Sequence, residues 1–437
     1  MINRQIEDFT SQSILDLGIQ YLSGPVQIAN ARKRGKKIVA GFLPPMELVF
    51  AAKNTLPLFL PRLTEFPFSQ YIGIVNIINR LHLLKYVLSY YSKNQDRVSM
   101  SYFDSFNQSE FSKIFTSLIH LAEKAEFYMD TCVQTRICYG ALVKNFHLID
   151  LVAGGLEGDY CLHFAKFYER MTNFKPVFYF EKPYGDRSNK ALVDVITEEL
   201  HRYIATLENL SGATITEPGL LKIANITNEI RGYMRELYGY YIKGYVPLHT
   251  AALLLVHGSY VDFLSDAPFF LNKMRNLVQE IRRKYRKGLP NYRKEGVYRV
   301  LIAGSPGFDP ILPSTFEKAG AVLQYLDLFE SCTRYKGIKT TVNMIENYAN
   351  YLLDLNIKEG IMDLIDIWLA AAKKIKADAI LFSNVWGCRF TTPAYRKMKD
   401  LVNAELGIPI YPLDFYSPGD SLGQVQTRIG AFIEMLK

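Results

Sequence analysis

The sequence predicts an α/β protein with two parallel-sheet domains and a helical insert between them. Several short runs of β-branched and aromatic residues end in glycine, proline or serine. These runs are apolar on both faces, which is typical of buried parallel strands. Helical patterns alternate with them, as in layered α/β folds. A central stretch, 189–287, shows helical periodicity almost throughout and predicts the insert.

The predicted strands fall into two groups along the chain. The first group lies before the helical stretch, at Lys37–Phe42, Leu148–Val152 and Val177–Phe180. The second group follows it, at Tyr298–Ala303, Ala321–Asp327, Ala379–Phe382 and Ile408–Leu413. Because the two groups are separated by so much helical sequence, we expect two sheets rather than one.

The predicted helices of the central stretch begin with Ala191–Leu207, whose apolar residues recur at a spacing near 3.6. Pro218 is expected to open the next helix, since proline suits the first helical turn. A further long helix, or a pair of helices, is predicted over His249–Arg283. Near the end of the chain, turn residues precede an amphipathic run at Val425–Leu436, which predicts a C-terminal helix.

Length and composition agree with this division. A chain of 437 residues is too long for one compact core, and its 49% hydrophobic content is ample for several. We expect an N-terminal α/β domain at 1–188 that carries Cys132 and Cys161. A helical region at 189–295 and a C-terminal α/β domain at 296–437, which carries Cys388, complete the prediction.

The net charge is positive, since 51 basic minus 43 acidic residues gives +8. This charge suits an anionic substrate or an acidic partner, but no motif resembles a nucleic-acid-binding module. Basic residues cluster at Arg32–Lys37 and Arg282–Lys294. Each cluster is interpreted either as a solvated loop or as a contact with coenzyme phosphates or a partner subunit.

The compartment is expected to be the cytoplasm. The N-terminal residues contain no apolar core of a signal peptide, and apolar runs such as Ala251–Val256 are too short to cross a bilayer. In a reducing compartment, the five cysteines are better read as free thiols or metal ligands than as disulfides.

Cys132, Cys161 and Cys388 are the candidate ligands of a metal site. Cys161 and Cys388 each follow a predicted strand, and ligand sites of open α/β sheets form beyond the carboxyl ends of strands. Cys161 also opens a predicted helix, where the thiolate that iron requires is favoured. From spacing alone each cysteine could instead be a small buried apolar residue, since no CxxC pair anchors a site. Cys138 and Cys332 are predicted to be structural.

Other catalytic patterns are missing from the sequence. We find no Ser–His–Asp arrangement, no HExxH and no paired zinc motif. The glycine turn at Gly304–Gly307 could present backbone N–H groups to a phosphate, but it lacks both the P-loop lysine motif and GxGxxG.

Several segments together resemble one known family, the component-D proteins of 2-hydroxyacyl-CoA dehydratases and benzoyl-CoA reductases. The resemblance runs from about Lys37 to Lys437. Its segments are Pro45–Leu48 with the following alanine pair, Cys132 to Gly140, Gly158–Cys161 before Phe167–Glu169, Pro176–Tyr184, Ile302–Pro306, Gly320–Val322, Ser331–Tyr335, Ser383–Cys388 and Tyr416–Ser421 with its following helix. No single segment is specific to this family, but the order and the separations of the segments are.

The resemblance implies two flavodoxin-like domains with a helical part and one [4Fe–4S] cluster held by Cys132, Cys161 and Cys388. It also implies a homologous second subunit, usually in a heterodimer, and an ATP-hydrolysing iron–sulfur activator that delivers one electron. The implied reaction is the dehydration of (R)-2-hydroxyacyl-CoA to enoyl-CoA through a ketyl radical. The cofactor would supply the chemistry, and the protein its orientation and surroundings.

Three alternatives remain open from the sequence. The chain could be a benzoyl-CoA reductase-type subunit that reduces an aryl-CoA, or a double-cubane reductase, although five cysteines are few for a larger cluster. It could also be a cluster-free structural paralogue. The loop Gly41–Pro44 motivates this last alternative, because it has no polar side chain where many relatives carry one.

Overall fold

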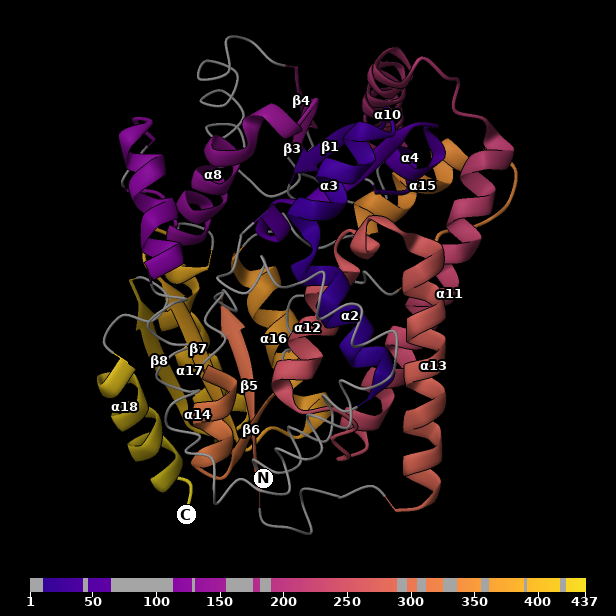
Figure 1. Cartoon of the computed structure of the whole chain (residues 1–437). Coiled ribbons are helices and arrows are strands. Elements are labelled where there is room, and N and C mark those ends of the chain that lie inside the picture. Colours follow the sequence, from indigo (N-terminus) through magenta and orange to yellow (C-terminus); the bar gives the residue numbers. More distant parts are fainter. Residues whose placement is uncertain are drawn as a thin grey trace.

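Two four-stranded sheets, each with all strands parallel, form the framework of the molecule (Figure 1). The computed structural model describes residues 11–41, 46–63, 113–127, 130–154, 176–180, 190–288, 297–304, 312–324, 336–354, 361–388, 391–416 and 422–437. The predicted α/β class with two parallel-sheet domains is confirmed.

The first sheet has the strand order β2-β1-β3-β4. Its strands are β1 (Lys37–Gly41), β2 (Thr55–Phe59), β3 (Leu151–Gly154) and β4 (Val177–Tyr179). Strand β2 was not predicted, because Pro57 interrupts its apolar run. The strand lies at the edge of the sheet, where a missing N–H donor is tolerated.

The second sheet has the strand order β6-β5-β7-β8. Its strands are β5 (Tyr298–Gly304), β6 (Ala321–Gln324), β7 (Ala379–Val385) and β8 (Ile410–Phe415). Counted within each sheet, both orders read 2-1-3-4, which is the order of flavodoxin-like folds. In such folds the crevice for a ligand opens between the first and third strands, here β1 and β3 or β5 and β7.

The same aspartate contact fixes the register of the two central strands in both sheets. Asp150 directly precedes β3 and accepts a hydrogen bond from the backbone N–H of Ile38 at 2.9 Å. Asp378 directly precedes β7 and accepts one from the backbone N–H of Arg299 at 2.7 Å. Since Ile38 and Arg299 are each the second residue of their strand, the two sheets are built alike.

The helices pack around and between these sheets. Their bounds are α2 (Gln12–Leu22), α3 (Gly24–Lys33), α4 (Met46–Ala51), α8 (Val133–Asn145), α10 (Lys190–Ser211), α11 (Glu217–Ile242), α12 (Thr250–Tyr260), α13 (Ala267–Arg286), α14 (Leu312–Lys318), α15 (Met344–Asp354), α16 (Ile361–Ile375), α17 (Tyr395–Glu405) and α18 (Leu422–Glu434). A further helix covers 113–124. Short 3₁₀ turns are η1 (Leu60–Leu63), η4 (Phe146–Leu148), η5 (Phe263–Ser265) and η7 (Thr392–Ala394).

Helix α11 begins where the sequence predicts. Thr216 is its N-cap, and its hydroxyl accepts a hydrogen bond from the N–H of Gly219 at 3.3 Å. Pro218 lies in the first turn, where its missing N–H costs nothing. Cap and proline together therefore set the start of this long helix.

Of the two alternatives predicted over 249–283, a long helix or a pair of helices, the structure shows the pair, α12 and α13, separated by a left-handed turn at η5. Phe263, Leu264 and Ser265 have φ values of 49°, 53° and 60°. Asp262 stabilises this costly conformation, because its carboxylate accepts a hydrogen bond from the N–H of Leu264 at 3.0 Å. The same carboxylate forms a buried ion pair with Arg62 at 2.5 Å.

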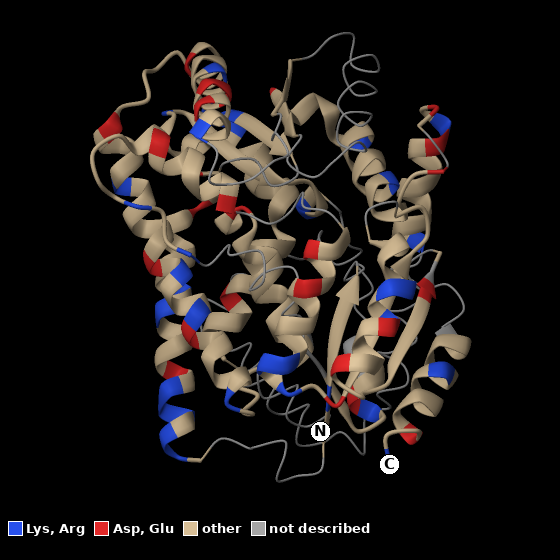
Figure 2. Cartoon of the chain, turned by 180° about the vertical axis from the view of Figure 1, so that it is seen from behind, with Lys and Arg blue, Asp and Glu red and all other residues tan. Residues whose placement is uncertain are grey.

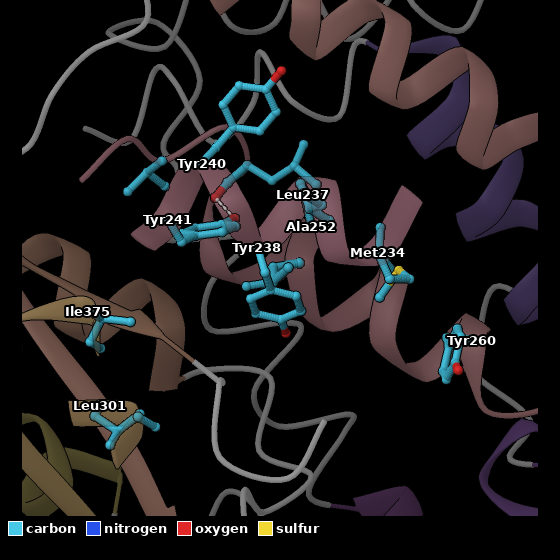
Figure 3. Close-up of a cluster of buried hydrophobic side chains, with 14 of the residues drawn as sticks. Met234, Leu237, Tyr238, Tyr240, Tyr241, Ala252, Tyr260, Leu301 and Ile375 are labelled. Carbon is cyan, nitrogen blue, oxygen red and sulfur yellow. Dashed lines mark hydrogen bonds between the residues drawn. The ribbon is translucent and has the colours of Figure 1, made fainter. Parts of the chain in front are cut away.

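The helical region buries a core of its own against the second sheet. Figure 3 shows Tyr238, Tyr241 and Met234 of α11 in this cluster, together with Leu301 of β5 and Ile375 of α16. The Tyr241 hydroxyl donates a hydrogen bond to the carbonyl of Leu248 at 2.7 Å, so its polar end is satisfied within the apolar cluster.

One helix crosses from the late part of the chain to the first sheet. Helix α15 belongs in sequence to the predicted C-terminal region, but its Tyr348 and Leu352 are buried in one cluster with Val39 and Leu151. Figure 1 places α15 beside α4 and α10, at the opposite end of the molecule from β8 and α18. The two lobes, meaning each sheet with its covering helices, are therefore interleaved in sequence.

The basic clusters are largely engaged within the chain. Arg32 and Lys37 both contact Asp150, at 2.6 and 3.6 Å, so this cluster fastens α3 to the first sheet. Along α13, Arg282 pairs with Glu236 at 2.6 Å. Lysines and arginines gather at the end of that helix (Figure 2). Residues 289–294 of the second cluster lie outside the described residues. Among the described helices, none combines the length and apolar character needed to cross a bilayer.

Candidate functional site

The structure brings Cys132 and Cys388 together from different lobes. Cys132 is the N-cap residue of α8, beside the first sheet. Cys388 follows β7 of the second sheet, in a turn closed by a hydrogen bond from its N–H to the carbonyl of Val385 at 3.0 Å. The two side chains lie within interaction distance of each other across the junction of the lobes. Both residues are partly exposed.

The surroundings of Cys132 act on its pKa in two directions. The hydrogen bond with Cys388, burial and the charge of a second thiolate raise the pKa of Cys132 well above its usual value. The backbone N–H groups of Gln134 and Thr135, in the first turn of α8, act in the opposite direction and lower the pKa of Cys132. Without a cation, the Cys132 thiol therefore resists ionisation, although the helix terminus favours a thiolate.

Gly387 makes the close approach of the two segments possible. A Cβ on this residue would lie 2.6 Å from the carbonyl oxygen of Thr131 and 2.9 Å from the backbone nitrogen of Cys132. Its φ of 75° also lies in the left-handed region that favours glycine. The turn after β7 thus rests directly on the peptide that precedes the first cysteine.

Thr391 supports the other sulfur. Its hydroxyl lies 3.1 Å from the Cys388 sulfur, and the residue is buried. This contact was not predicted from the sequence, although a threonine three residues after a cysteine in a turn is a recognisable local pattern.

Arg136 joins the two cysteine-bearing segments from the side. It lies four residues after Cys132 on α8, and its guanidinium carbon is 5.4 Å from the ring centroid of Trp386. Its Nη1 pairs with Glu123 at 3.2 Å. Trp386 is 44% exposed, so one face covers the guanidinium while much of the ring faces solvent.

The remaining cysteines divide between the core and the parts of the chain outside the described residues. Cys138 is fully buried in the apolar cluster around α8, which is consistent with its predicted structural role. Cys161, the third predicted ligand, and Cys332 lie outside the described residues. Within the described ranges, no three metal-ligating side chains converge.

Glu47, in the segment that resembles the family's glutamate motif, is buried and engaged. Its carboxylate pairs with Arg231 of α11 at 2.5 Å, and both side chains are almost inaccessible. Residues 42–45, most of the apolar loop noted in the sequence, lie outside the described residues. In this structure Glu47 ties α4 to α11.

Comparison with known proteins identifies the family of this chain. The family model described as "2-hydroxyglutaryl-CoA dehydratase, D-component" matches residues 113–436, which include every candidate cysteine. The chain is also 25% identical over 307 residues to an Escherichia coli (strain K12) protein named "Putative dehydratase subunit YjiM", covering 67% of this chain and 75% of the relative. The match to the family model extends over well more than half of the sequence, and the chain belongs to the 2-hydroxyglutaryl-CoA dehydratase D-component family.

Proposed function

We propose that this chain is the iron–sulfur subunit of a 2-hydroxyacyl-CoA dehydratase, with Cys132, Cys161 and Cys388 holding one [4Fe–4S] cluster. The observation that carries the proposal is the contact between Cys132 and Cys388 across the two lobes. Two cysteines that are 256 positions apart (388 − 132) have little reason to meet in an exposed junction unless they act on the same group.

The residues present fit such a cluster. Cysteine thiolates are the usual ligands of iron–sulfur clusters, and two sulfurs already lie side by side here. The N–H groups of the first turn of α8 stabilise negative charge on one sulfur, and Thr391 hydrogen-bonds the other. A bound metal would lower the raised pKa of Cys132, because its positive charge favours the thiolate.

The position of Cys161 in the sequence supports its role as the third ligand. Cys388 comes ten positions after Asp378, and Cys161 comes eleven positions after Asp150 (388 − 378 and 161 − 150). These aspartates occupy equivalent positions in the two sheets. In the sequence, both cysteines therefore come after the third strand of their sheet, and ligands of such folds bind beyond the carboxyl ends of strands.

The proposed reaction is the dehydration of (R)-2-hydroxyacyl-CoA to enoyl-CoA. When bound, the cluster would supply one-electron chemistry and a Lewis-acidic iron for the substrate, after ATP-driven activation. The chain's own contribution is to hold the sulfurs at the junction of the lobes and to limit access of water there. The words "component" and "subunit" in the names of the family and the relative support a second, homologous subunit as partner.

Anaerobic purification with iron and sulfide analysis tests the cluster. Cys132→Ser and Cys388→Ser should each lose most of the iron. Cys138→Ala, which removes a thiol from the same helix but from its buried face, should keep it. Wild-type protein without iron, or equal iron in all variants, would contradict the proposal.

A substrate assay then separates the two enzyme classes. With the partner subunit, an ATP-hydrolysing activator and a reductant, a 2-hydroxyacyl-CoA should lose water. Turnover of benzoyl-CoA instead would identify a reductase with the same metal centre.

A further inference from the structure

Arg136 is an unusual side chain for its position. Only 8% of the residue is exposed, and charged residues are rarely so buried unless they are paired. Its partners come from two other elements: Glu123 from the helix at 113–124, and Trp386 from the segment after β7. The guanidinium therefore bridges the first lobe and the second.

One donor of this guanidinium is left over. The Nε of Arg136 is buried, and no acceptor lies within hydrogen-bonding distance of it in the described part of the chain. Burying an N–H donor without an acceptor is costly, and a bound ion or ligand is one of the explanations for such a donor in a native protein. This donor belongs to a residue that contacts both cysteine-bearing segments.

The contacts of Arg136 link it to both segments that carry the cysteines. The backbone N–H of Arg136 donates to the carbonyl of Cys132 at 3.1 Å, so the two residues are one helical turn apart, a rise of about 6 Å. Trp386, which the guanidinium covers, is two residues before Cys388. Glu123 neutralises the charge only in part, because it is itself partly exposed to water.

We propose that Arg136 is a positioning residue of the cysteine site. Its contact with Trp386 holds the Cys388 turn against α8, and its fixed positive charge stabilises negative charge on the group that the cysteines bind. The electrostatic role rests on the proposed function. The mechanical role, which is the contact with Trp386, does not. Since reduction adds one negative charge to a cluster, a neighbouring cation raises its reduction potential.

The electrostatic role is tested by a potentiometric titration of the anaerobic holoprotein, followed by electron paramagnetic resonance. Arg136→Met should disfavour reduction about tenfold, which is a shift of 59 mV to more negative potential for one electron. Arg136→Lys should restore most of the difference. Glu123→Gln should shift the potential in the opposite direction, because it removes a negative charge and leaves the arginine uncompensated.

Arg202 offers a matched control. It pairs with Glu199, three residues away, and lies over the ring of Phe178 at 5.7 Å, so it has the same kinds of partner outside the cysteine site. Arg202→Met should leave the potential unchanged. If Arg136→Met and Glu123→Gln shift the reduction potential in the same direction, the electrostatic role is refuted. The two variants change the charge of the site in opposite directions, whereas a disturbance of its packing would not depend on the charge removed.

The mechanical role is tested on metal-free protein. Oxidised glutathione should convert the thiols of Cys132 and Cys388 into a disulfide, releasing two molecules of reduced glutathione, and peptide mass spectrometry would quantify the cross-link. Arg136→Met should slow this reaction severalfold, and Arg202→Met should not. An unchanged rate would refute the positioning role. A wild-type protein that holds no cluster would refute the proposed function but not the positioning role, because the cross-linking measurement needs no metal.

Discussion

Replacing Gly387 by alanine should open the junction between the two cysteines. The new Cβ would lie 2.6 Å from the Thr131 carbonyl oxygen and 2.9 Å from the Cys132 nitrogen, and both atoms belong to backbone that cannot rotate away. The left-handed φ of 75° costs alanine about 1–2 kcal/mol. Overpacking against rigid neighbours adds about 1–3 kcal/mol. The total destabilisation is therefore about 2–5 kcal/mol.

Gly35 separates these two contributions. Its φ is 76°, nearly identical to that of Gly387, but a Cβ there would meet nothing within 4 Å. Gly35→Ala should thus lose only about 1–2 kcal/mol, through the backbone conformation alone.

Urea denaturation of both variants measures the difference, and cross-linking of Cys132 to Cys388 by oxidised glutathione reports the junction itself. Gly387→Ala should be the less stable variant and should cross-link several times more slowly than wild type. If both variants lose the same stability and cross-link at the wild-type rate, the Cys388 turn does not rest on α8 and the described site is wrong.

Three further outcomes follow from the buried polar groups. Asp262→Asn should lower the free energy of unfolding by about 3–5 kcal/mol in urea denaturation, because Arg62 keeps a buried charge without its counter-ion. Breaking an exposed ion pair between α11 and α13 should cost less than about 1 kcal/mol. Glu47→Gln should lower the free energy of unfolding by about as much as Asp262→Asn. If this variant keeps the urea midpoint of the wild type, Glu47 does not tie α4 to α11. In metal-free protein, Cys388→Ala should lower the pKa of Cys132, because the largest cause of its elevation is removed. Iodoacetamide should then alkylate Cys132 faster at a fixed, mildly alkaline pH. An unchanged alkylation rate would contradict the contact between the two cysteines.

The sheets were predictable because their strands are apolar on both faces. The predicted strands starting at Lys37 and Tyr298 are observed at the centres of their sheets. Strand β2 escaped prediction because Pro57 argues against a strand unless its edge position is known. The turn at 263–265 escaped it because three consecutive left-handed residues, none of them glycine, leave no signal in composition. The turn is stabilised by Asp262 and by contacts of Ser265 with Pro57 and Arg62, which are distant in the sequence.

The sequence predicted which strand end carries a cysteine of the candidate site, but not the contacts of the site's side chains. The position of Cys388 beyond the end of a parallel strand indicated a ligand site, and the structure places it against Cys132. The contact of Arg136 with Trp386 could not be read from the sequence, because the two residues are 250 positions apart (386 − 136) and only the docking of the lobes joins them.

The position of α15 has a consequence for biosynthesis. The core on one face of the first sheet stays incomplete on the ribosome until residues 344–354 have been made, because Tyr348 and Leu352 belong to it. The N-terminal sheet therefore cannot finish folding before most of the chain has been translated. Assembly of the cysteine junction comes later still, when Cys388 emerges, so any metal must be inserted after synthesis is nearly complete.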